Sequence, residues 1–398
     1  GGGTPMAKAE DIVQLAYRLS LAASLMMASS LQEGGLDPSA FIPILNKNDP
    51  NKAIAGMAWS LSHFKRDRMP QYGYSYESPP ESEKKHEDEG LVDLSALCEW
   101  SESVAPLLPA CLPTFLHQVF FPDRAYPPSR TPIIFPNLKE KASAFFESPS
   151  SPLLFSFASM SSALGGSWHR LYTSDSDGLS FNRLQLALLG YGGPTIMIIR
   201  SVSGGMFGAF TSAQWKETKD FYGTSDCFLY QLLPNMSVYR PRGSGTNYMY
   251  CNSEARSKGY DRQAHGIGFG GTTDQPRLFI TESFDDCVAS SNDLTFERGP
   301  LLPKSAEGMP QKYFEIESLE VWGVGGDEIV EGALGARAKQ RDITAANIRK
   351  ARKVDKAAFL DDFRSGLIDS KAFKHRGETQ GRHDFEADDN NRRNKGSN

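Results

Sequence analysis

The sequence predicts an α+β fold, in which a compact and mostly antiparallel β domain is flanked by helices on both sides. Between residues 167 and 326, short apolar runs follow one another closely and each is closed by Gly, Pro, Asn or Asp, a pattern typical of strands joined by turns. In residues 9–30, apolar residues recur three or four positions apart, as they do on one face of a helix. The highly charged segment after residue 326 is predicted to be a second helical region.

Composition and cysteine usage limit the classes of function. The 398 residues are 39% hydrophobic, which allows at least one full core. The formal charge of −5, from 43 Lys and Arg against 48 Asp and Glu, argues against a protein that coats nucleic acid with a basic surface. The five cysteines form no Cys-x-x-Cys pair, which disfavours a disulfide framework or a zinc site and favours a reducing cytosolic or nuclear compartment.

The sequence predicts no direct transmembrane or lipid anchor. No segment reaches the roughly 18 apolar residues that a transmembrane helix needs. The apolar run 21–28 does not fit a secretion signal, because Glu10 and Asp11 precede it where positive charge is required. Residues 1–5 resemble a cloning remnant, and the residue after the first Met is Ala7, which does not fit an N-myristoylation signal.

The N-terminal region, residues 6–64, is predicted to be a helical module. In residues 9–30, one face is predicted to carry Ile12, Leu15, Leu19, Ala22 and Met26. Residues 38–46 and 52–64 are two further predicted helices, and an Asp-Pro pair marks the start of each. This arrangement resembles a degenerate EF-hand. Residues 46–56 lack the alternating ligands, central Gly and closing Glu of a calcium loop, so plain helix packing is favoured over calcium binding.

Two segments connect this module to the β domain. Residues 65–90 are dense in charged residues, Ser and Pro, and are predicted to be a disordered loop. Residues 91–150 are predicted to be a helical and Pro-rich wrapping segment. It begins with a short amphipathic helix at 91–100, through Leu94, Leu97 and Cys98, and continues with another apolar stretch at 112–121. Prolines then impose extended backbone, at positions 122, 127, 128, 132 and 136.

The β domain, residues 151–326, has one predicted helix and a series of strands. The helix is residues 180–189, where Ser180 can act as the cap and the apolar residues share one face. In the last strand the apolar residues change parity near Ser318, which predicts a β-bulge. The predicted strands are residues 195–200, 206–211, 227–233, 237–240, 248–251, 278–281 and 314–323.

Two motifs in the β domain match part of a ligand-binding sequence pattern but lack the structural context or the ligand residues that the site needs. Residues 266–271 match a dinucleotide fingerprint, but no helix is predicted to follow, so glycines that let strands bend and pack closely are favoured. Asp175, Asp177 and Gly178 could begin a calcium loop, but position twelve is Leu186 instead of the Glu that calcium needs. A turn followed by a helix cap is therefore the favoured interpretation.

One nucleophile constellation can be assembled from the sequence, namely Cys227 or Cys251 with His265 and Asp261. No local nucleophile signature surrounds either cysteine, so a buried structural role is favoured for both. The sequence thus predicts no catalytic residue, no cofactor-binding residue and no metal ligand.

Residues 327–376 are predicted to be a basic helical region, and residues 377–398 a disordered tail. On a helical wheel the basic residues cluster on one side, opposite a narrow stripe of Ile343, Ala351, Val354 and Ala358. This stripe is thin for insertion into lipid but suits close packing against another protein. The predicted partner-binding residues are Arg349, Arg352, Lys353, Lys356, Phe359, Leu360 and Phe363.

The order and spacing of several motifs resemble the TLDc family. They are Ser-Trp-His-Arg-Leu-Tyr-Thr-Ser-Asp-Ser-Asp-Gly-Leu-Ser-Phe (167–181), Gly-Met-Phe-Gly-Ala-Phe (205–210), Phe-Tyr-Gly (221–223), Gly-Phe-Gly-Gly (268–271) and Val-Trp-Gly (321–323). The resemblance covers roughly residues 151–326 and implies a β-sandwich with peripheral helices. The helical flanks resemble those of plant relatives of an animal lysosomal mTOR-associated TLDc protein.

The resemblance also implies a function. It implies a role in oxidative-stress resistance and binding to the peripheral V1 sector of the vacuolar H⁺-ATPase, without an established catalytic mechanism. It further implies a cytoplasmic protein, peripheral at the vacuolar or lysosomal membrane or nuclear, with mTOR-pathway components as further partners. Two classes stay open: a non-catalytic regulator that docks on a large assembly, and an antioxidant enzyme or thiol scavenger that uses a cysteine. The lack of a complete catalytic signature favours the regulator.

Overall fold

The computed structural model describes residues 6–30, 51–64, 90–122, 124–140, 142–253, 264–304 and 312–364, with the side chains of residues 28–30 and 351–364 excepted. Gly1–Arg337 form one compact unit and Ala338–Asn398 a second. Four predicted features lie outside the described residues: the remnant at 1–5, the helix at 38–46, the tail at 377–398 and, apart from its last residue, the loop at 65–90.

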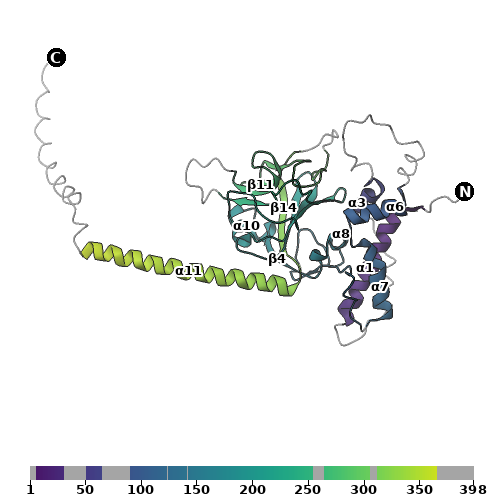
Figure 1. Cartoon of the computed structure of the whole chain (residues 1–398), viewed down its shortest axis with the longest axis horizontal. Helices are drawn as coiled ribbons and strands as arrows, with labels where there is room; N and C mark the ends of the chain where they lie inside the picture. The colour runs from purple at the N-terminus through teal and green to yellow at the C-terminus, as the bar shows by residue number, and fades with distance from the viewer. Residues whose placement is uncertain are drawn as a thin grey trace, which may run out of the picture. The chain divides into compact units, whose positions relative to one another are not determined.

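Two β-sheets form the centre of the first unit, so the α+β prediction is confirmed (Figure 1). The larger sheet has seven strands in the order β3-β4-β14-β5-β6-β7-β8. Neighbouring strands pair antiparallel, except that β3 and β4 pair parallel. The strand bounds are β3 Asn137–Leu138, β4 Ser167–Thr173, β5 Thr195–Ser201, β6 Met206–Thr211, β7 Phe228–Leu233, β8 Ser237–Tyr239 and β14 Ile316–Gly323.

The smaller sheet has five strands in the order β13-β12-β11-β10-β9. The glycine motif at 266–271 is the strand β10, and the next element is another strand, as the sequence analysis predicted. Gly270 and Gly271 have φ values of 67° and 69°, a region that favours glycine, and lead into the turn before β11. The strand bounds are β9 Tyr250–Asn252, β10 Gly266–Gly271, β11 Pro276–Thr281, β12 Cys287–Ala289 and β13 Tyr313–Phe314.

The β-bulge predicted near Ser318 is present. The register of β14 against β5 shifts between Ile316 and Ser318. A second shift, against β4, lies between Val321 and Trp322. Each shift re-aims the side chains of β14, which is how this central strand changes parity along its length.

The described chain before the β domain is mostly helical. The predicted bounds of α1 are confirmed, and its predicted face is confirmed in part: Ala22 is buried and Ile12 and Leu19 pack against the core, but Leu15 is 58% exposed. Ala9, Val13 and Ala16, which the prediction left out, are buried as well. Because these side chains are small, α1 can lie close to α7 and α3, which it contacts. The helix bounds are α1 Ala9–Ser30, α3 Lys52–Ser62, α6 Leu94–Ser103, α7 Cys111–Phe120 and α8 Pro152–Met160.

The helix predicted at 91–100 begins later and buries a different face. Leu91–Asp93 is the strand β2, which pairs with β1 (Met6–Lys8), and Asp93 caps α6. Leu94, expected to be buried, is 66% exposed, and Cys98 is exposed. Trp100 is buried instead and donates its indole N–H to Ser60 Oγ at 2.9 Å. The strands β1 and β2 are far apart in sequence, so their pairing cannot be predicted from local periodicity.

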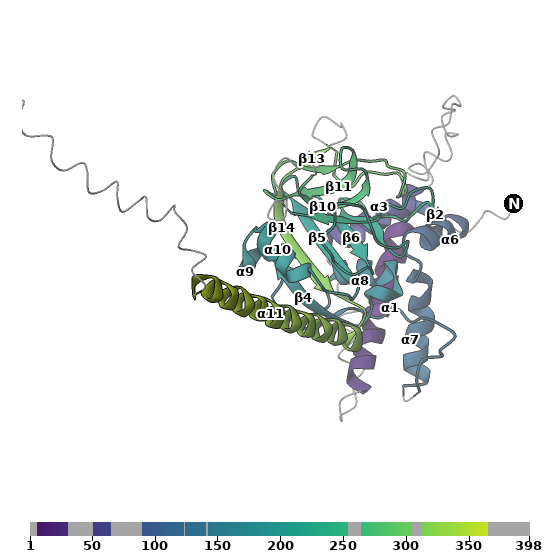
Figure 2. The ribbon, with the colours of Figure 1, turned by 60° about the vertical axis from the view of Figure 1, so that its left-hand side comes forward.

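Two hydrophobic clusters lie on the two faces of the large sheet. Along β5, Met197 and Ile199 belong to the cluster shared with the small sheet. Ile196 and Ile198 belong to the cluster shared with α1, α3 and α8. Figure 2 shows the small sheet and the helices around the strands β5 and β6. The large sheet is therefore buried on both faces, because successive side chains of a strand point to opposite sides.

The basic segment at the C-terminus is the helix α11, Asp327–Arg364, so the predicted helix is confirmed over these residues. Residues 365–376 of the prediction lie outside the described part. Among the described helices, none is by itself long and apolar enough to cross a membrane. One bent pair, Leu94–Ser103 with Leu108–Phe120 at 112°, passes that test of length and composition.

Candidate functional site

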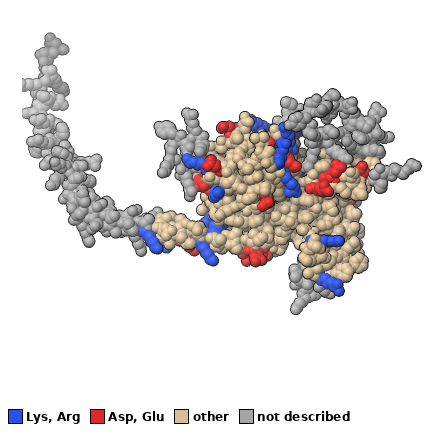
Figure 3. Space-filling view, viewed as in Figure 1, with Lys and Arg blue, Asp and Glu red and all other residues tan. Residues whose placement is uncertain are grey.

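The predicted partner-binding residues all lie on α11. Every side chain from Ala338 to Lys350 is exposed, including Arg349. Figure 3 shows Lys and Arg side chains along this part of the helix. The side chains of the other predicted residues, Arg352, Lys353, Lys356, Phe359, Leu360 and Phe363, lie outside the description, although the backbone that carries them is helical.

The helical backbone determines how these positions are arranged. Steps of three and four residues lead from 349 through 352, 356 and 359 to 363, and such positions share one face of an α-helix. The basic positions come first along this face and the apolar positions follow about one turn later.

The first turns of α11 are anchored to the β domain. Val330 is buried, and Ala333 and Leu334 pack against the cluster between the sheets. Arg337 donates a hydrogen bond from Nη1 to the carbonyl of Ala187, and its guanidinium lies 5.8 Å from the centre of the Tyr191 ring. These contacts hold residues 327–337 against the domain as part of the first unit.

Asp327, the first residue of α11, is the centre of a polar cluster. Its Oδ1 lies 2.9 Å from His169 Nε2 and 3.0 Å from Lys139 Nζ, and its Oδ2 accepts from Ser167 Oγ at 2.9 Å. The hydrogen bond from His169, followed by those from Lys139 and Ser167, lowers the pKa of Asp327 to about 2. The carboxylate stays ionised at neutral pH, where it suits the positive end of the helix dipole.

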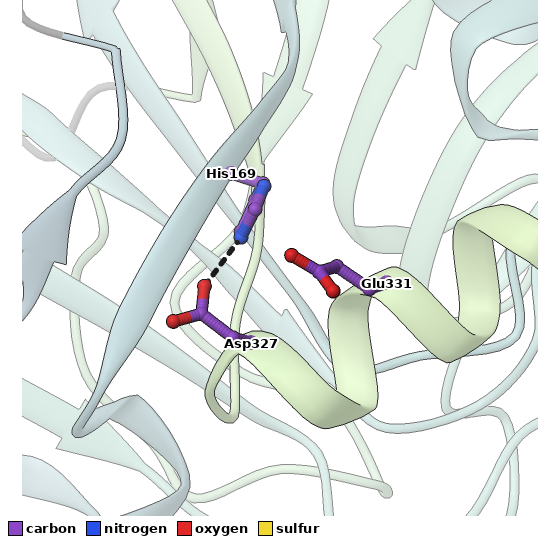
Figure 4. Close-up of side chains that lie close together, drawn as sticks. All are labelled: His169, Asp327 and Glu331. Carbon is purple, nitrogen blue, oxygen red and sulfur yellow. Dashed lines mark hydrogen bonds and ion pairs between the residues drawn. The ribbon is translucent and has the colours of Figure 1, made fainter.

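Glu331 lies one turn further along α11. Its carboxylate points towards His169 and Asp327 (Figure 4), and the possible ligand atoms of the three residues lie within 4.8 Å of one another. Sequence reasoning missed this group because β4 and α11 are far apart in the chain. Only the i, i+4 spacing of Asp327 and Glu331 was visible beforehand.

A second polar group missed from the sequence surrounds Glu320, a buried carboxylate on β14. It accepts hydrogen bonds from Ser143 Oγ at 2.8 Å, Ala144 N at 2.9 Å and Trp322 Nε1 at 2.9 Å. These bonds attach residues 143–144 to the large sheet. A Glu between Leu319 and Val321 in an apolar strand was the only sequence signal. Because its acceptor sites are used for this attachment, its role in the structure is positional.

The cysteines of the β domain have the environment of structural residues. Cys227, Cys251 and Cys287 are buried, and burial raises the pKa of all three thiols, to about 12 for Cys227 and Cys251. Cys111 is also buried with a raised pKa, and Cys98 is exposed. A nucleophilic thiol needs the opposite shift, towards the thiolate.

Among the described residues, no hydrogen bond joins His265 to Cys227 or Cys251. Cys251 pairs with Ile267 across β9 and β10. Asp261 lies outside the described residues. The imidazole Nε2 of His265 is buried without a hydrogen-bond partner among the described residues.

The candidate calcium loop at 175–186 is formed by two helices. Asp177 accepts a hydrogen bond from the backbone N–H of Thr173 at 3.2 Å, at the short helix α9 (Ser174–Asp177). The helix α10 (Phe181–Leu188) then buries its apolar face as predicted. Ser180 stands at its N-cap position without a side-chain cap hydrogen bond, which differs from the predicted cap.

Comparison with known proteins identifies the β domain. A sequence profile of the TLDc domain matches residues 150–325. The MTOR-associated protein MEAK7 of Danio rerio is 27% identical over 248 residues, which is 61% of this chain and 52% of that protein. Its namesake in Xenopus laevis is 31% identical over 159 residues, which is 40% of this chain and 32% of that protein.

A more distant relative is the Oxidation resistance protein 1 of Xenopus tropicalis, 23% identical over 130 residues, which is 33% of this chain and 15% of that protein. The chain thus spans about half, or less, of the length of the curated relatives that it matches. The matched region contains both sheets except the short strand β3. This chain therefore contains a TLDc domain, at residues 150–325.

Proposed function

We propose that this protein is a non-catalytic regulator that binds the peripheral V1 sector of the vacuolar H⁺-ATPase through α11. In this proposal it contributes to oxidative-stress resistance or to growth signalling at the vacuole or lysosome, as a cytoplasmic protein peripheral to that membrane or as a nuclear one. The proposal includes mTOR-pathway components as further partners and a place among plant TLDc proteins. The names of the relatives, an mTOR-associated protein and an oxidation resistance protein, support this direction.

The observation that carries the proposal is the contrast between residues 327–337 and residues 338–350 of α11. Residues 327–337 are packed against the TLDc domain, whereas all side chains from Ala338 to Lys350 are exposed. Most helical stability in proteins comes from packing of an apolar face. The exposed residues 338–350, with basic residues enriched after Arg337, suit a docking element for an acidic partner surface with an apolar groove.

The alternative function is an antioxidant enzyme or thiol scavenger that uses a cysteine of the TLDc domain. Burial and the raised pKa of Cys227, Cys251 and Cys287 disfavour it, because the thiolate is the reactive form. Cys98 is exposed but lies on α6, outside the TLDc domain.

Capture of V1 by the tagged protein tests the proposal. Immobilised full chain is incubated with detergent-free V1 released from vacuolar membranes, and bound subunits are identified by mass spectrometry. We expect V1 subunits to be retained by the wild type and by Cys251→Ala alike. No retention of V1 at micromolar protein, together with peroxide protection that disappears in Cys251→Ala, would favour the scavenger instead.

A further inference from the structure

We infer that His169, Asp327 and Glu331 form a binding site for a divalent transition-metal ion of the zinc type. The site lies at the point where α11 leaves the TLDc domain, and it combines one imidazole from β4 with two carboxylates from the first turns of α11. It is independent of V1 binding, because it requires only residues of the first unit.

The distances suit a compact coordination shell. In a tetrahedral zinc site with ligand bonds of about 2.0–2.1 Å, neighbouring ligand atoms are about 3.3 Å apart. His169 Nε2 and Asp327 Oδ1 are 2.9 Å apart, and the three ligand atoms lie within 4.8 Å of one another. Only Glu331, which is exposed, has to move closer, and rotation of its side chain is sufficient for that.

The supporting contacts orient the first two ligands. Ser167 Oγ holds Asp327 Oδ2, which leaves Oδ1 directed at His169. The imidazole is only 17% exposed, so its position is restricted by its surroundings. Hydrogen bonds of this kind to the non-coordinating atom of a ligand are a regular feature of metal sites and raise their affinity.

Glu331 gives a separate indication of a cation. Its carboxylate is turned towards the carboxylate of Asp327 (Figure 4), and it makes no hydrogen bond or ion pair with any residue that the structure describes. Like charges that converge in this way repel each other unless a positive charge lies between them. The third group at that point is an imidazole, a common ligand for zinc.

Lys139 competes with the metal. Its ammonium group lies 3.0 Å from Asp327 Oδ1, and its side chain is 40% exposed, so it can swing into solvent when a cation takes its place. The apo site is thus partly neutralised by a removable charge. The affinity of the site for the metal should consequently increase when this ammonium group is removed. A cluster that serves only as a structural ion pair would show no such increase.

The donor set selects the kind of metal. One imidazole nitrogen and two carboxylate oxygens favour Zn²⁺, Co²⁺ or Ni²⁺. Ca²⁺ prefers six to eight oxygen ligands, and Mg²⁺ prefers near-octahedral oxygen coordination. Three ligands that include an imidazole supply neither arrangement. The cysteines do not take part, so the lack of a cysteine zinc motif in the sequence does not bear on this site.

Titration of the metal-free full chain with Co²⁺ and Zn²⁺ tests the inference. We expect one equivalent of Co²⁺ to develop the visible d–d absorption of a four-coordinate ion, and Zn²⁺ to displace it. Glu331→Gln should weaken Zn²⁺ binding at least about tenfold, and Lys139→Met should tighten it by about tenfold, while Ca²⁺ has no effect. Glu328→Gln, one position after Asp327 and outside the cluster, is the matched control and should leave the affinity unchanged.

His169→Ala should abolish the cobalt spectrum, and circular dichroism verifies that this variant is folded. If it is not, the exposed Glu331 still decides the question, since its substitution does not affect the core. Unchanged Zn²⁺ affinity in Glu331→Gln, weaker binding in Lys139→Met, or no binding below millimolar metal would each overturn the inference.

Discussion

At the scale of single residues, the glycine motif of β6 is explained by one hydrogen bond. Tyr230 on β7 donates its hydroxyl to the carbonyl of Met197 on β5 at 2.7 Å, and this bond passes over Gly208 on the strand between them. A Cβ at Gly208 would lie 1.9 Å from that carbonyl oxygen and 2.6 Å from the hydroxyl. Only glycine fits there without displacing backbone.

Substitution of Gly208 by Ala should therefore destabilise the protein by about 1–3 kcal/mol, the usual cost of overpacking a core. Gly332→Ala is the matched control, because Gly332 lies on α11 with nothing within 4 Å of its added Cβ. It should stabilise by about 0.5–1 kcal/mol, since alanine is the better helix former. Urea unfolding followed by tryptophan fluorescence measures both changes. Equal effects of the two substitutions would contradict this explanation of the motif.

The aromatic residues of the family motifs also act through packing. Trp168 and Trp322 are fully buried, and both pack edge-on against Phe146, with ring centres 6.0 and 6.2 Å away. Phe157 joins them at 5.3 Å from Trp168. The tryptophans of the TLDc motifs are thus explained by packing in the core, and no chemical role is needed to explain them.

The thiols should respond to alkylation according to their burial. With the pKa of Cys227 and Cys251 raised to about 12, roughly one such thiol in ten thousand is ionised at pH 8, and the thiolate is the reactive form. Iodoacetamide should then label exposed Cys98 within minutes and leave Cys227 and Cys251 unmodified. Peptide mapping by mass spectrometry reads the sites, and labelling of all five cysteines in denaturant is the control. Rapid labelling of Cys251 in the folded protein would support the scavenger alternative.

At the scale of elements, the sequence predicted what depends on local pattern. The bounds of α1, the strands β5 and β6, and the bulge in β14 follow from periodicity, turn residues and parity. The face predicted for α1 is confirmed at Ala22 and wrong at Leu15, because the prediction left out small buried residues such as Ala16. Close packing of α1 depends on the surfaces of the helices that it contacts. The sequence of α1 alone does not specify those surfaces.

The candidate site divides in the same way. The basic helix was predicted from local charge, and its backbone is confirmed as far as Arg364. The polar cluster around Asp327 was not predicted, because its members come from segments far apart in the chain. Lys139 directly follows β3, Ser167 and His169 lie on β4, and Asp327 begins α11. Such pairings are set by sheet order, which one sequence without its fold does not give.

The element α11 carries its own prediction. If the apolar residues Phe359 and Phe363 fill a groove on V1, truncation should cost about 2 kcal/mol or more for each, so Phe359→Ala with Phe363→Ala should abolish capture. Arg352→Glu with Lys353→Glu should slow association and weaken binding most at low salt, because exposed charges mainly steer the encounter. Surface plasmon resonance at two salt concentrations separates the two effects. Equal losses in both variants at high salt would argue against this division of roles.

At the scale of the whole molecule, the N-terminal helices and the TLDc domain share one hydrophobic cluster. Trp100 and Leu61 from the N-terminal region lie in the same cluster as Trp168 and Ile198 of the large sheet. The N-terminal helices and the TLDc domain accordingly belong to one compact unit, which ends at Arg337. Docking variants should thus preserve this whole unit, including the anchored first turns of α11.

The central claim, that the part of α11 after Arg337 is the docking element, is tested most directly by a chain that ends at Arg337. This end keeps buried Val330, the Asp327 cluster and the contacts of Arg337, so the first unit should unfold at the same temperature as in the full chain. We expect its affinity for purified V1 to fall at least about a hundredfold relative to the full chain, because the apolar anchors are removed. Undiminished affinity of the folded, shortened chain would contradict the claim and place the interface within residues 1–337.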